Sequence, residues 1–433
     1  MTGFSHTSWR KPSIRTHDRP TIFLAGVVFG SLLLWAFFSV STIDPIFIFS
    51  RPMPESCQCD KPDPAFNLQS DPPASTFYDD PNFGYTIDES IKNWDQKRQV
   101  WLELHPSFKP KSHDRVFIIT GSQSTPCTGP SGDHILLRTY RNKVDYCRIH
   151  GYDIFYNNVK LDPNMPGGWG KLPAVRATMV AHPEAEWIWW LDEDTVITDM
   201  EYKIPFLQYE GYNFVLHGWP IEVYEKKSWL GLNDGSFLIR NCQWSLDLLD
   251  MWADMGPRSP NFDKWTKILL DEFKHGPTDQ TALAYLIWKK QSDSFGKKML
   301  IETRYYLEGY WTGIVDTLKN ITERYLEVET REGMLRRRHA EKVSETYGLL
   351  REPSLKDAGN EFGSWRRPFV THFAGCQPCS GKHNPVFTGE SCRNGMDKAL
   401  NFADNQVLRN YGFVHRNLLD SSVVSSLPFD HPA

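Results

Sequence analysis

Three acidic residues, Asp192, Glu193 and Asp194, directly follow the apolar stretch "WIWWL" at residues 187–191. An apolar run without alternation is expected for a strand buried on both faces, and ligands bind where such strands end. In an extended chain, side chains two positions apart point the same way, so we expect Asp192 and Asp194 to converge and Glu193 to turn aside. Two convergent carboxylates suit Mg²⁺ or Mn²⁺, above all when substrate phosphates complete the shell. An exposed acidic loop is the simpler alternative, because short D-x-D matches arise by chance.

A third ligand could come from "THFAG" at residues 371–375, which places His372 at the end of a strand-like stretch. Histidine is a common metal ligand, although a single histidine is more often structural.

The N-terminal region predicts a membrane anchor. Residues 20–43 contain no charged side chain, and about 20 apolar residues suffice to span a bilayer. The preceding segment carries four basic residues against one acid, so we expect residues 1–20 in the cytosol, an anchor at 21–43 and the rest of the chain in the secretory lumen. A cleaved signal peptide is the competing interpretation, but it usually has a shorter apolar core followed by a small-residue cleavage site.

The remaining chain divides by composition. Residues 44–112 are rich in Pro, Asp and Ser and predict a luminal stem without a core of its own. We expect a catalytic domain at 113–418, with a charged, solvent-exposed helical insertion at 319–360, and a C-terminal tail at 419–433. The net charge of −5 argues against a nucleic-acid binder.

Strand-like and helix-like stretches alternate within that domain. The alternation predicts an α/β fold with a mostly parallel, Rossmann-like sheet. We expect strands at 115–122, 152–158, 187–194, 212–219 and 234–241, and helices at 135–151, 172–186, 244–256, 279–290 and 396–413.

Eight cysteines in an oxidising lumen favour disulfides. The "CQPC" at 376–379 has the spacing of a redox centre but lacks the βαβ setting, and a zinc site would need further ligands such as Cys392 and His383. We therefore favour a disulfide between Cys392 and one cysteine of this pair. Cys57 and Cys59 in the stem could link a homodimer. Asn320 lies in the one N-x-[ST] sequence and is expected to carry a glycan on a surface loop.

A divalent metal, a diphosphate and a luminal anchor together favour a nucleotide-sugar glycosyltransferase. The metal would act as a Lewis acid that stabilises the departing diphosphate.

Several long motifs support this interpretation by resemblance: "GDHILL" at 132–137, "KLPAVR" at 171–176, "HGWP" at 217–220, "THFAGCQPCSGKHN" at 371–384 and "NFADNQVLRNYGFVH" at 401–415. In this order they resemble the plant galactomannan α-1,6-galactosyltransferase and xyloglucan α-1,6-xylosyltransferase family over residues 113–418. The resemblance implies a GT-A fold, retention of configuration, a UDP-sugar donor, Mn²⁺ or Mg²⁺ and a β-1,4-linked polysaccharide acceptor.

The resemblance also implies roles for individual residues. The implied metal ligands are Asp192, Asp194 and His372, and Asp279 and Gln280 would lie beside the reacting sugar as catalytic candidates. The donor would contact Thr120, Gly121, Ser122, Lys171, Asp192, Glu193, Asp194, Gly375 and Gln377. The donor sugar or acceptor would contact His217, Asn233 and Asp234.

This chain departs from the family pattern at several of these positions. Glu193 replaces the serine of "DSD", and Thr278 replaces an acid of "DDQ", so that we expect no second acid beside Asp279. Asp234 stands where a small or neutral residue is common, and it would either orient sugar hydroxyls or form a turn before Gly235. Gln377 and the charged insertion are shared with the galactosyl branch and favour UDP-galactose.

We therefore expect a type II Golgi membrane protein that transfers galactose, with retention, from UDP-galactose to O6 of mannosyl residues in a galactomannan or glucomannan. The departing diphosphate would take the acceptor proton, with covalent catalysis by Asp279 as the alternative. The rival functions are transfer from UDP-xylose to a β-1,4-glucan and a non-catalytic role within a Golgi polysaccharide synthase complex.

Overall fold

The computed structural model describes residues 75–81, 83–108, 115–335, 344–359 and 364–428. The predicted cytosolic tail, anchor at 21–43 and stem cysteines lie outside these residues. Within the described ranges, no helix combines the length and apolar character needed to cross a membrane.

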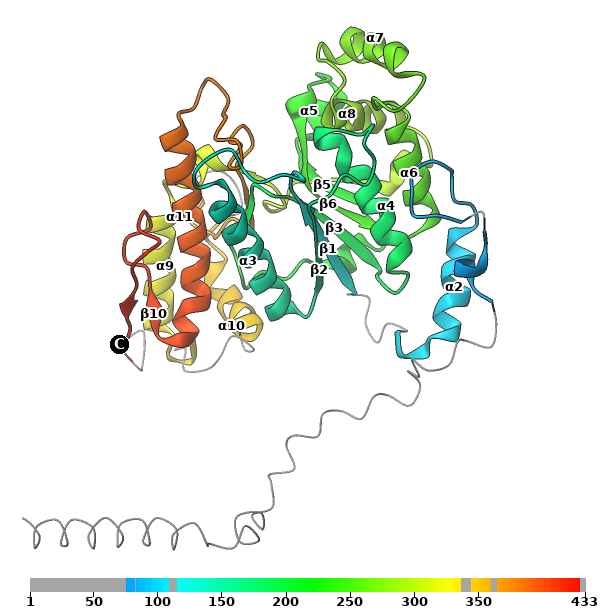
Figure 1. The fold of residues 1–433 in the computed structure, drawn as a ribbon. Coiled ribbons are helices and arrows are strands. Elements are labelled where there is room, and N and C mark those ends of the chain that lie inside the picture. Colours follow the sequence, from blue (N-terminus) through cyan, green and yellow to red (C-terminus); the bar gives the residue numbers. More distant parts are fainter. Residues whose placement is uncertain (1–74, 82, 109–114, 336–343, 360–363, 429–433) are drawn as a thin grey trace, which may run out of the picture. The chain divides into compact units, whose positions relative to one another are not determined.

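A six-stranded sheet forms the centre of the fold (Figure 1), with the strand order β2-β1-β3-β6-β5-β7. Its strands are β1 (Val116–Gly121), β2 (Asp153–Asn157), β3 (Trp187–Asp192), β5 (Phe214–Gly218), β6 (Leu232–Arg240) and β7 (Met299–Glu302).

The sheet is mostly parallel, as the sequence predicted, because only β6 runs against the direction of the other strands. β1 runs parallel to β2 and β3, and β5 runs parallel to β7. β6 is antiparallel to both of its neighbours, β3 and β5.

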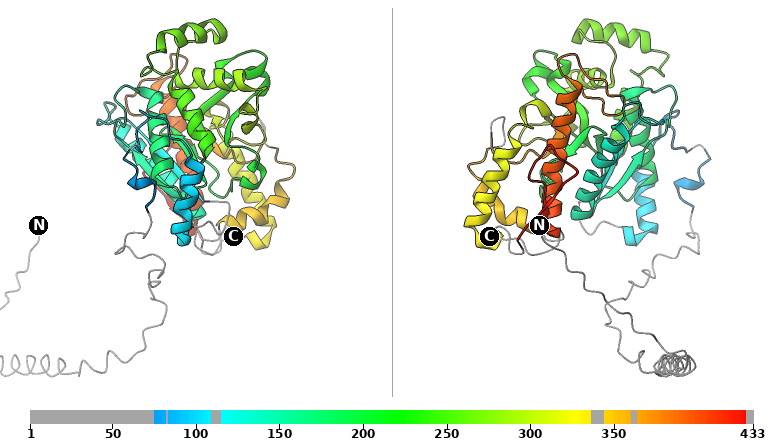
Figure 2. Two further views of the ribbon diagram at one scale, coloured as in Figure 1. Left: turned by 90° about the vertical axis from the view of Figure 1, so that its right-hand side faces the viewer. Right: turned by 60° about the vertical axis from the view of Figure 1, so that its left-hand side comes forward.

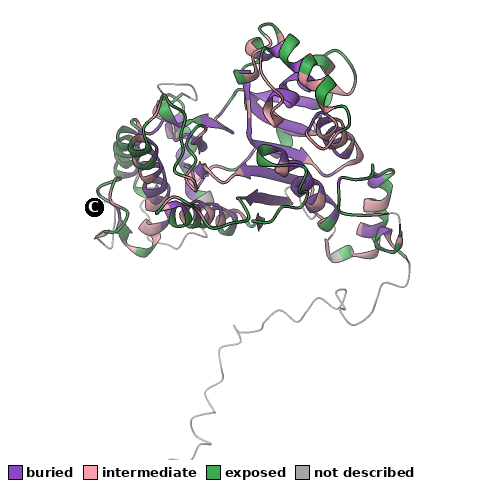
Figure 3. Cartoon of the chain, turned by 45° about the horizontal axis from the view of Figure 1, so that its top comes forward, coloured by how far each residue is buried: buried purple, intermediate pink, exposed green. Residues whose placement is uncertain are grey.

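Helices cover both faces of this sheet, and alternate residues of each strand enter two separate cores. Ile188 and Trp190 of β3 face the core on the side of α2 (Trp94–Leu104), α4 (Lys171–Ala181), α6 (Gln243–Ala253), α7 (Phe262–Phe273) and α8 (Asp279–Lys290). Trp187, Trp189 and Leu191 face the other core, with α3 (Gly132–His150), α9 (Leu318–Arg331) and α11 (Gly389–Leu408). Figure 2 shows α9 in yellow beside α11 in orange, and Figure 3 shows the buried residues concentrated in the strands.

A second, three-stranded sheet has the order β4-β9-β8, formed by β4 (Thr195–Ile197), β9 (Val370–His372) and β8 (Gly309–Tyr310). In its register, Thr195 pairs with His372. The residue that directly precedes Thr195 is Asp194, so this pairing brings the distant histidine to the acidic turn.

Part of the predicted stem packs against the domain. Between residues 75 and 108 the chain contains α2, and Trp94 at its start is completely buried in the first core. The indole Nε1 of Trp94 donates to Asn241 Oδ1 at 2.7 Å, and Arg98 donates to the Pro183 carbonyl at 2.6 Å. The sequence did not indicate this docking, because the composition of residues 44–112 as a whole conceals one short helix that packs against the domain.

The charged segment 319–360 is helical, but it is not simply a solvent-exposed insertion. Its first helix, α9, buries Ile321, Tyr325 and Val328 in a packed face. Glu329 is fully buried and pairs with Arg351 of α10 (Ser344–Arg351) at 2.6 Å and with Arg409. The predicted glycan acceptor Asn320 is exposed in the first turn of α9 rather than in a loop. Near the C-terminus, β10 (Phe413–Val414) pairs with β11 (Ser425–Ser426). Part of the predicted tail at 419–433 therefore forms a strand against the end of the predicted catalytic domain.

Candidate active site

Asp192, Asp194 and His372 meet at the end of β3, and each offers one ligand atom within 4.8 Å of the others. His372 Nε2 lies 3.1 Å from Asp194 Oδ1 and 3.9 Å from Asp192 Oδ2. The two aspartates converge as predicted, but through a turn at residues 193–194 rather than along an extended strand. Two carboxylates and one imidazole form a ligand set that fits Mn²⁺ or Mg²⁺.

Neighbouring groups fix the orientation of these ligands. Glu308 Oε1 lies 3.1 Å from His372 Nδ1, and the indole of Trp190 donates to Asp192 Oδ1 at 2.6 Å. A carboxylate behind a ligating histidine is a common supporting contact in metal sites, because it fixes the ring and raises its basicity. Sequence reasoning missed Glu308, whose short strand-like context "YYLEGY" gave no metal signal.

The charge of this group attracts a cation. Burial alone would lower the pKa of His372, but the carboxylates of Asp194 and Glu308 outweigh it and raise that pKa well above its usual value. The site therefore favours positive charge, either as a proton on His372 or as a metal ion among the three ligands.

Glu193, between the two aspartates, is not part of the ligand group. Desolvation and the nearby charges of Asp194 and Asp192 raise the pKa of Glu193 to about 8. Lys143 stabilises the end of this turn, because its Nζ donates a hydrogen bond to the Thr195 carbonyl at 2.8 Å. Nothing in the sequence indicated this supporting contact of Lys143.

A second cluster lies beside the first and centres on the buried Lys171 (3% exposed side chain). Its Nζ lies 3.1 Å from Asp234 Oδ1, 3.0 Å from Asp279 Oδ2 and 3.6 Å from Asp192 Oδ1. Asp192 thus belongs to both clusters, with His372 beside one of its oxygens and Lys171 beside the other.

The expectation that Asp279 has no acidic neighbour was wrong, because Asp234 lies next to it. Asp234 is a residue of β6 rather than of a turn, which removes the turn-forming interpretation. Burial and the Asp279 charge raise the pKa of Asp234 well above its usual value, despite Lys171. For Asp279, burial is outweighed by Lys171, which holds its pKa below the usual value, with a hydrogen bond from Asp234 acting in the same direction. The pKa values of the two carboxyl groups are thus shifted in opposite directions, upward for Asp234 and downward for Asp279.

Two glycines leave room for these side chains. A Cβ at Gly235 would overlap the His372 ring, with Nδ1 2.7 Å away, and a Cβ at Gly168 would overlap the Asp279 carboxylate. Neither glycine was singled out from the sequence for this role.

Asp279 and Gln280 begin α8, and their orientation follows from its cap. Thr278 Oγ1 accepts a hydrogen bond from the Thr281 amide at 3.1 Å, so this departure from "DDQ" caps the helix. Gln280 Nε2 donates to the Trp229 carbonyl at 3.0 Å. Asn233 Oδ1 accepts a hydrogen bond from the Gly235 amide at 2.7 Å. This contact stabilises the backbone of β6 on either side of Asp234.

Thr120, Gly121 and Ser122 lie at the carboxyl end of β1, where Gly121 is paired with Asp192 of β3. Gly121 approaches Asn157 too closely for any Cβ, and Ser122 Oγ accepts from the Tyr156 hydroxyl at 2.6 Å. These predicted donor residues therefore share one sheet edge with the acidic group.

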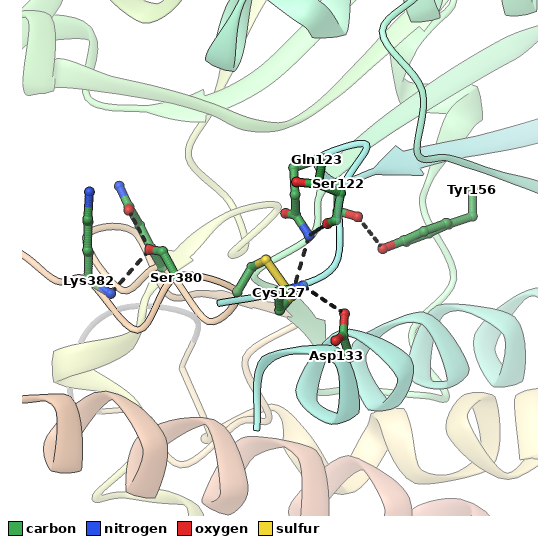
Figure 4. The surroundings of a disulfide bond; sticks show 10 residues. Ser122, Gln123, Cys127, Asp133, Tyr156, Ser380 and Lys382 are labelled. Atoms are coloured by element: carbon green, nitrogen blue, oxygen red, sulfur yellow. Dashed lines mark hydrogen bonds between the residues drawn. A yellow bond between two sulfur atoms is a disulfide. The ribbon is translucent and has the colours of Figure 1, made fainter. Parts of the chain in front are cut away.

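Two disulfides organise the loop after β9. Cys376 pairs with Cys392, a pairing that the sequence favoured. Cys379 pairs with Cys127 across 252 positions of the chain, and Figure 4 shows the surroundings of Cys127. These bonds exclude both the redox and the zinc interpretations of "CQPC". Gly375 has a φ of +88°, which favours glycine, and Gln377 donates its amide to the Lys382 carbonyl at 2.9 Å. The Cys127–Cys379 bond joins this loop to the loop that carries Ser122.

His217, at the end of β5, is buried, and burial lowers its pKa although Glu308 opposes the shift. Its ring packs edge-on against Trp219 at 5.5 Å and lies 5.8 Å from Tyr306. His217 therefore interacts electrostatically with Glu308, the residue that contacts His372.

Comparisons with known proteins agree with this site. Residues 112–383 match the galactosyl transferase GMA12/MNN10 family. The chain is 52% identical over 415 residues to Glycosyltransferase 6 of Arabidopsis thaliana, a match covering 95% of this chain and 94% of that protein. It is 55% identical over 371 residues to Galactomannan galactosyltransferase 1 of Cyamopsis tetragonoloba, covering 85% of this chain and 84% of that protein.

Solved structures give more distant matches. The galactosyltransferase LgtC with donor and acceptor sugar analogs is 10% identical, with a TM-score of 0.29 over 65% of this chain and 95% of that one. A glycosyltransferase that acts on the major capsid of PBCV-1 is 15% identical, with a TM-score of 0.33 over 46% of this chain and 85% of that one. The family match and the identities over most of both chains show that this chain belongs to the galactosyl transferase GMA12/MNN10 family of glycosyltransferases.

Proposed function

We propose that this glycosyltransferase has a GT-A fold and transfers galactose, with retention, from UDP-galactose to O6 of mannosyl residues in a mannan or glucomannan backbone. The observation that carries the proposal is the position of Asp192 between the two clusters. One of its oxygens lies 3.9 Å from His372 Nε2 and the other 3.6 Å from Lys171 Nζ. A diphosphate and its attached sugar need such adjacent sites. The 55% identity to a galactomannan galactosyltransferase supports the donor and acceptor named here.

Asp192, Asp194 and His372 would hold Mn²⁺, or Mg²⁺ in its place. When bound, such an ion supplies positive charge beside the departing diphosphate.

The chain's own residues act on the sugar. Lys171 fixes Asp279 and Asp234 in place, and the Asp279 carboxylate is available to accept hydrogen bonds from donor hydroxyls. In the reaction, the bond between the sugar C1 and the diphosphate oxygen breaks and a bond from C1 to the mannosyl O6 forms on the same face. The O6 proton passes to the departing diphosphate. The nearness of Asp234 to Asp279 makes the covalent route by Asp279 the alternative to examine.

We also propose that the domain lies in the Golgi lumen behind the anchor at residues 21–43. The two disulfides support an oxidising compartment, since such bonds are rare in the cytosol.

Product analysis tests the proposed function. The full-length protein is incubated with UDP-galactose, Mn²⁺ and mannohexaose, and the product is examined by NMR. We expect an α-anomeric galactose signal and a shifted mannosyl C6. A β-anomer would contradict retention, and xylose transferred to cellohexaose instead would favour the xylosyl rival. No transfer from any UDP-sugar, with stable co-purification of a synthase, would favour the scaffold.

A further inference from the structure

An exposed apolar strip borders the candidate active site. It is formed by Trp219, Ile221 and Leu230, which are 50%, 59% and 62% exposed. Trp219 is the only tryptophan in the described part of the chain that is classed as exposed. Leaving a large apolar side chain in water is unfavourable, so a contiguous exposed group beside a site indicates a ligand surface.

Backbone contacts tie this strip to the site. Trp219 precedes α5 (Pro220–Tyr224), and its amide donates to the Gly231 carbonyl at 2.7 Å, which places Leu230 next to it. The neighbouring Trp229 carbonyl holds the Gln280 side chain at 3.0 Å. On its inner side, the Trp219 ring contacts His217. The segments that carry the strip therefore contact α8, whose first residue is Asp279, and Figure 1 shows α5 next to α8.

We propose that Trp219, with Ile221 and Leu230, is the platform on which the acceptor polysaccharide lies beyond the reacting residue. The proposal rests on the proposed function and deepens it. The strip itself carries no charge, which suits a neutral polysaccharide. Pyranose rings present apolar C–H faces, and an exposed indole binds such faces with little loss of conformational freedom. The platform favours longer acceptors, because each further sugar residue that lies on the strip adds apolar contact.

Oligosaccharide binding by the full-length protein tests this platform. Calorimetry with mannohexaose and mannobiose is compared for the wild type, Trp219→Ala and Trp219→Phe. We expect Trp219→Ala to weaken mannohexaose binding about tenfold, with a much smaller effect on mannobiose and recovery in Trp219→Phe. The ratio of galactose transfer to UDP-galactose hydrolysis should fall by a similar factor. Tyr85→Ala, at 49% exposure on another segment, is the matched control and should change neither quantity.

The outcomes separate this inference from the proposed function. If cellohexaose rather than mannohexaose is the ligand weakened by Trp219→Ala, the platform stands and the mannan assignment falls. Unchanged binding of both hexaoses in Trp219→Ala would overturn the platform, as would a wild type that binds neither. If Trp219→Ala binds oligosaccharides normally but loses a protein partner, the strip is a protein interface, and the platform proposal is likewise overturned.

Discussion

His372 Nε2 lies 3.1 Å from Asp194 Oδ1, although 178 positions separate the two residues in the chain. The pairing of β4 with β9 produces this contact, since Thr195 and His372 occupy the same register position. The candidate metal site is thus assembled by a small sheet outside the central one. Its ligand geometry depends on that sheet as much as on the acidic turn.

Replacing Asp194 tests the ligand assignment. Asp194→Asn removes a charged ligand, and we expect Mn²⁺ affinity and galactose transfer to fall by at least about 100-fold. Titration calorimetry with Mn²⁺ measures the first quantity and labelled-sugar incorporation the second. Glu193→Gln is the matched control, because Glu193 lies outside the ligand group. This variant should retain most of the Mn²⁺ affinity and most of the galactose transfer. Undiminished turnover in Asp194→Asn would remove Asp194 from the site.

Gly235 provides a steric test of the same site. In Gly235→Ala the new Cβ overlaps the His372 ring, so we expect the ring to move and Mn²⁺ affinity to fall about 10- to 100-fold. Gly211→Ala is the control, since nothing lies within 4 Å of a Cβ at that position. Equal Mn²⁺ affinities in the two variants would show that His372 is not a ligand.

Much of this organisation was predictable from the sequence because local patterns determine it. The run before Asp192 is a strand because its apolar residues serve two cores, and the predicted helix at 279–290 matches α8 because Thr278 caps it. The long motifs indicated the family, which the comparisons confirm.

What local patterns could not predict depends on contacts between distant segments. Glu308 became recognisable only beside His372, and the nearness of Asp234 to Asp279 only through their shared contact with Lys171. The docking of Trp94 onto Asn241 and the burial of Glu329 likewise join segments whose composition suggests exposure. The antiparallel direction of β6 is also a property of strand pairing, which the periodicity of its residues does not reveal.

The disulfide between Cys127 and Cys379 gives a third prediction. Breaking it by Cys127→Ser frees the two loops that carry Ser122 and Gln377, so the KM for UDP-galactose should rise. Removing a native disulfide typically costs about 2–5 kcal/mol of unfolding free energy. Differential scanning calorimetry and donor kinetics measure the two effects. Cys242→Ser replaces a free cysteine and should leave both close to the wild type; a Cys127→Ser variant that behaves the same way would show that the bond constrains neither loop.

The buried Glu329 gives a prediction for pH. Burial alone would raise its pKa, but the guanidinium groups of Arg409 and Arg351 outweigh burial and lower it. The folded-state pKa is then below the unfolded one, so this stabilisation is present above about pH 4.5 and is lost as the pH falls through the folded value. Breaking such a buried pair costs about 3–5 kcal/mol.

Chemical denaturation at pH 7 and at lower pH checks this expectation. Glu329→Gln should destabilise the protein at pH 7 and weaken the pH dependence. Glu327→Gln on the same helix, where the side chain is 66% exposed, is the control and should have little effect. A pH dependence equally steep in Glu329→Gln and the wild type would assign it to other groups.

One competition experiment tests the central claim most directly. The full-length protein receives equal concentrations of UDP-galactose and UDP-xylose with Mn²⁺, and an equal mixture of mannohexaose and cellohexaose as acceptors. Mass spectrometry then identifies which sugar has joined which chain. We predict a hexose added to mannohexaose as the dominant product, absent in Asp194→Asn. A pentose added to cellohexaose as the dominant product would contradict the assignment of both donor and acceptor.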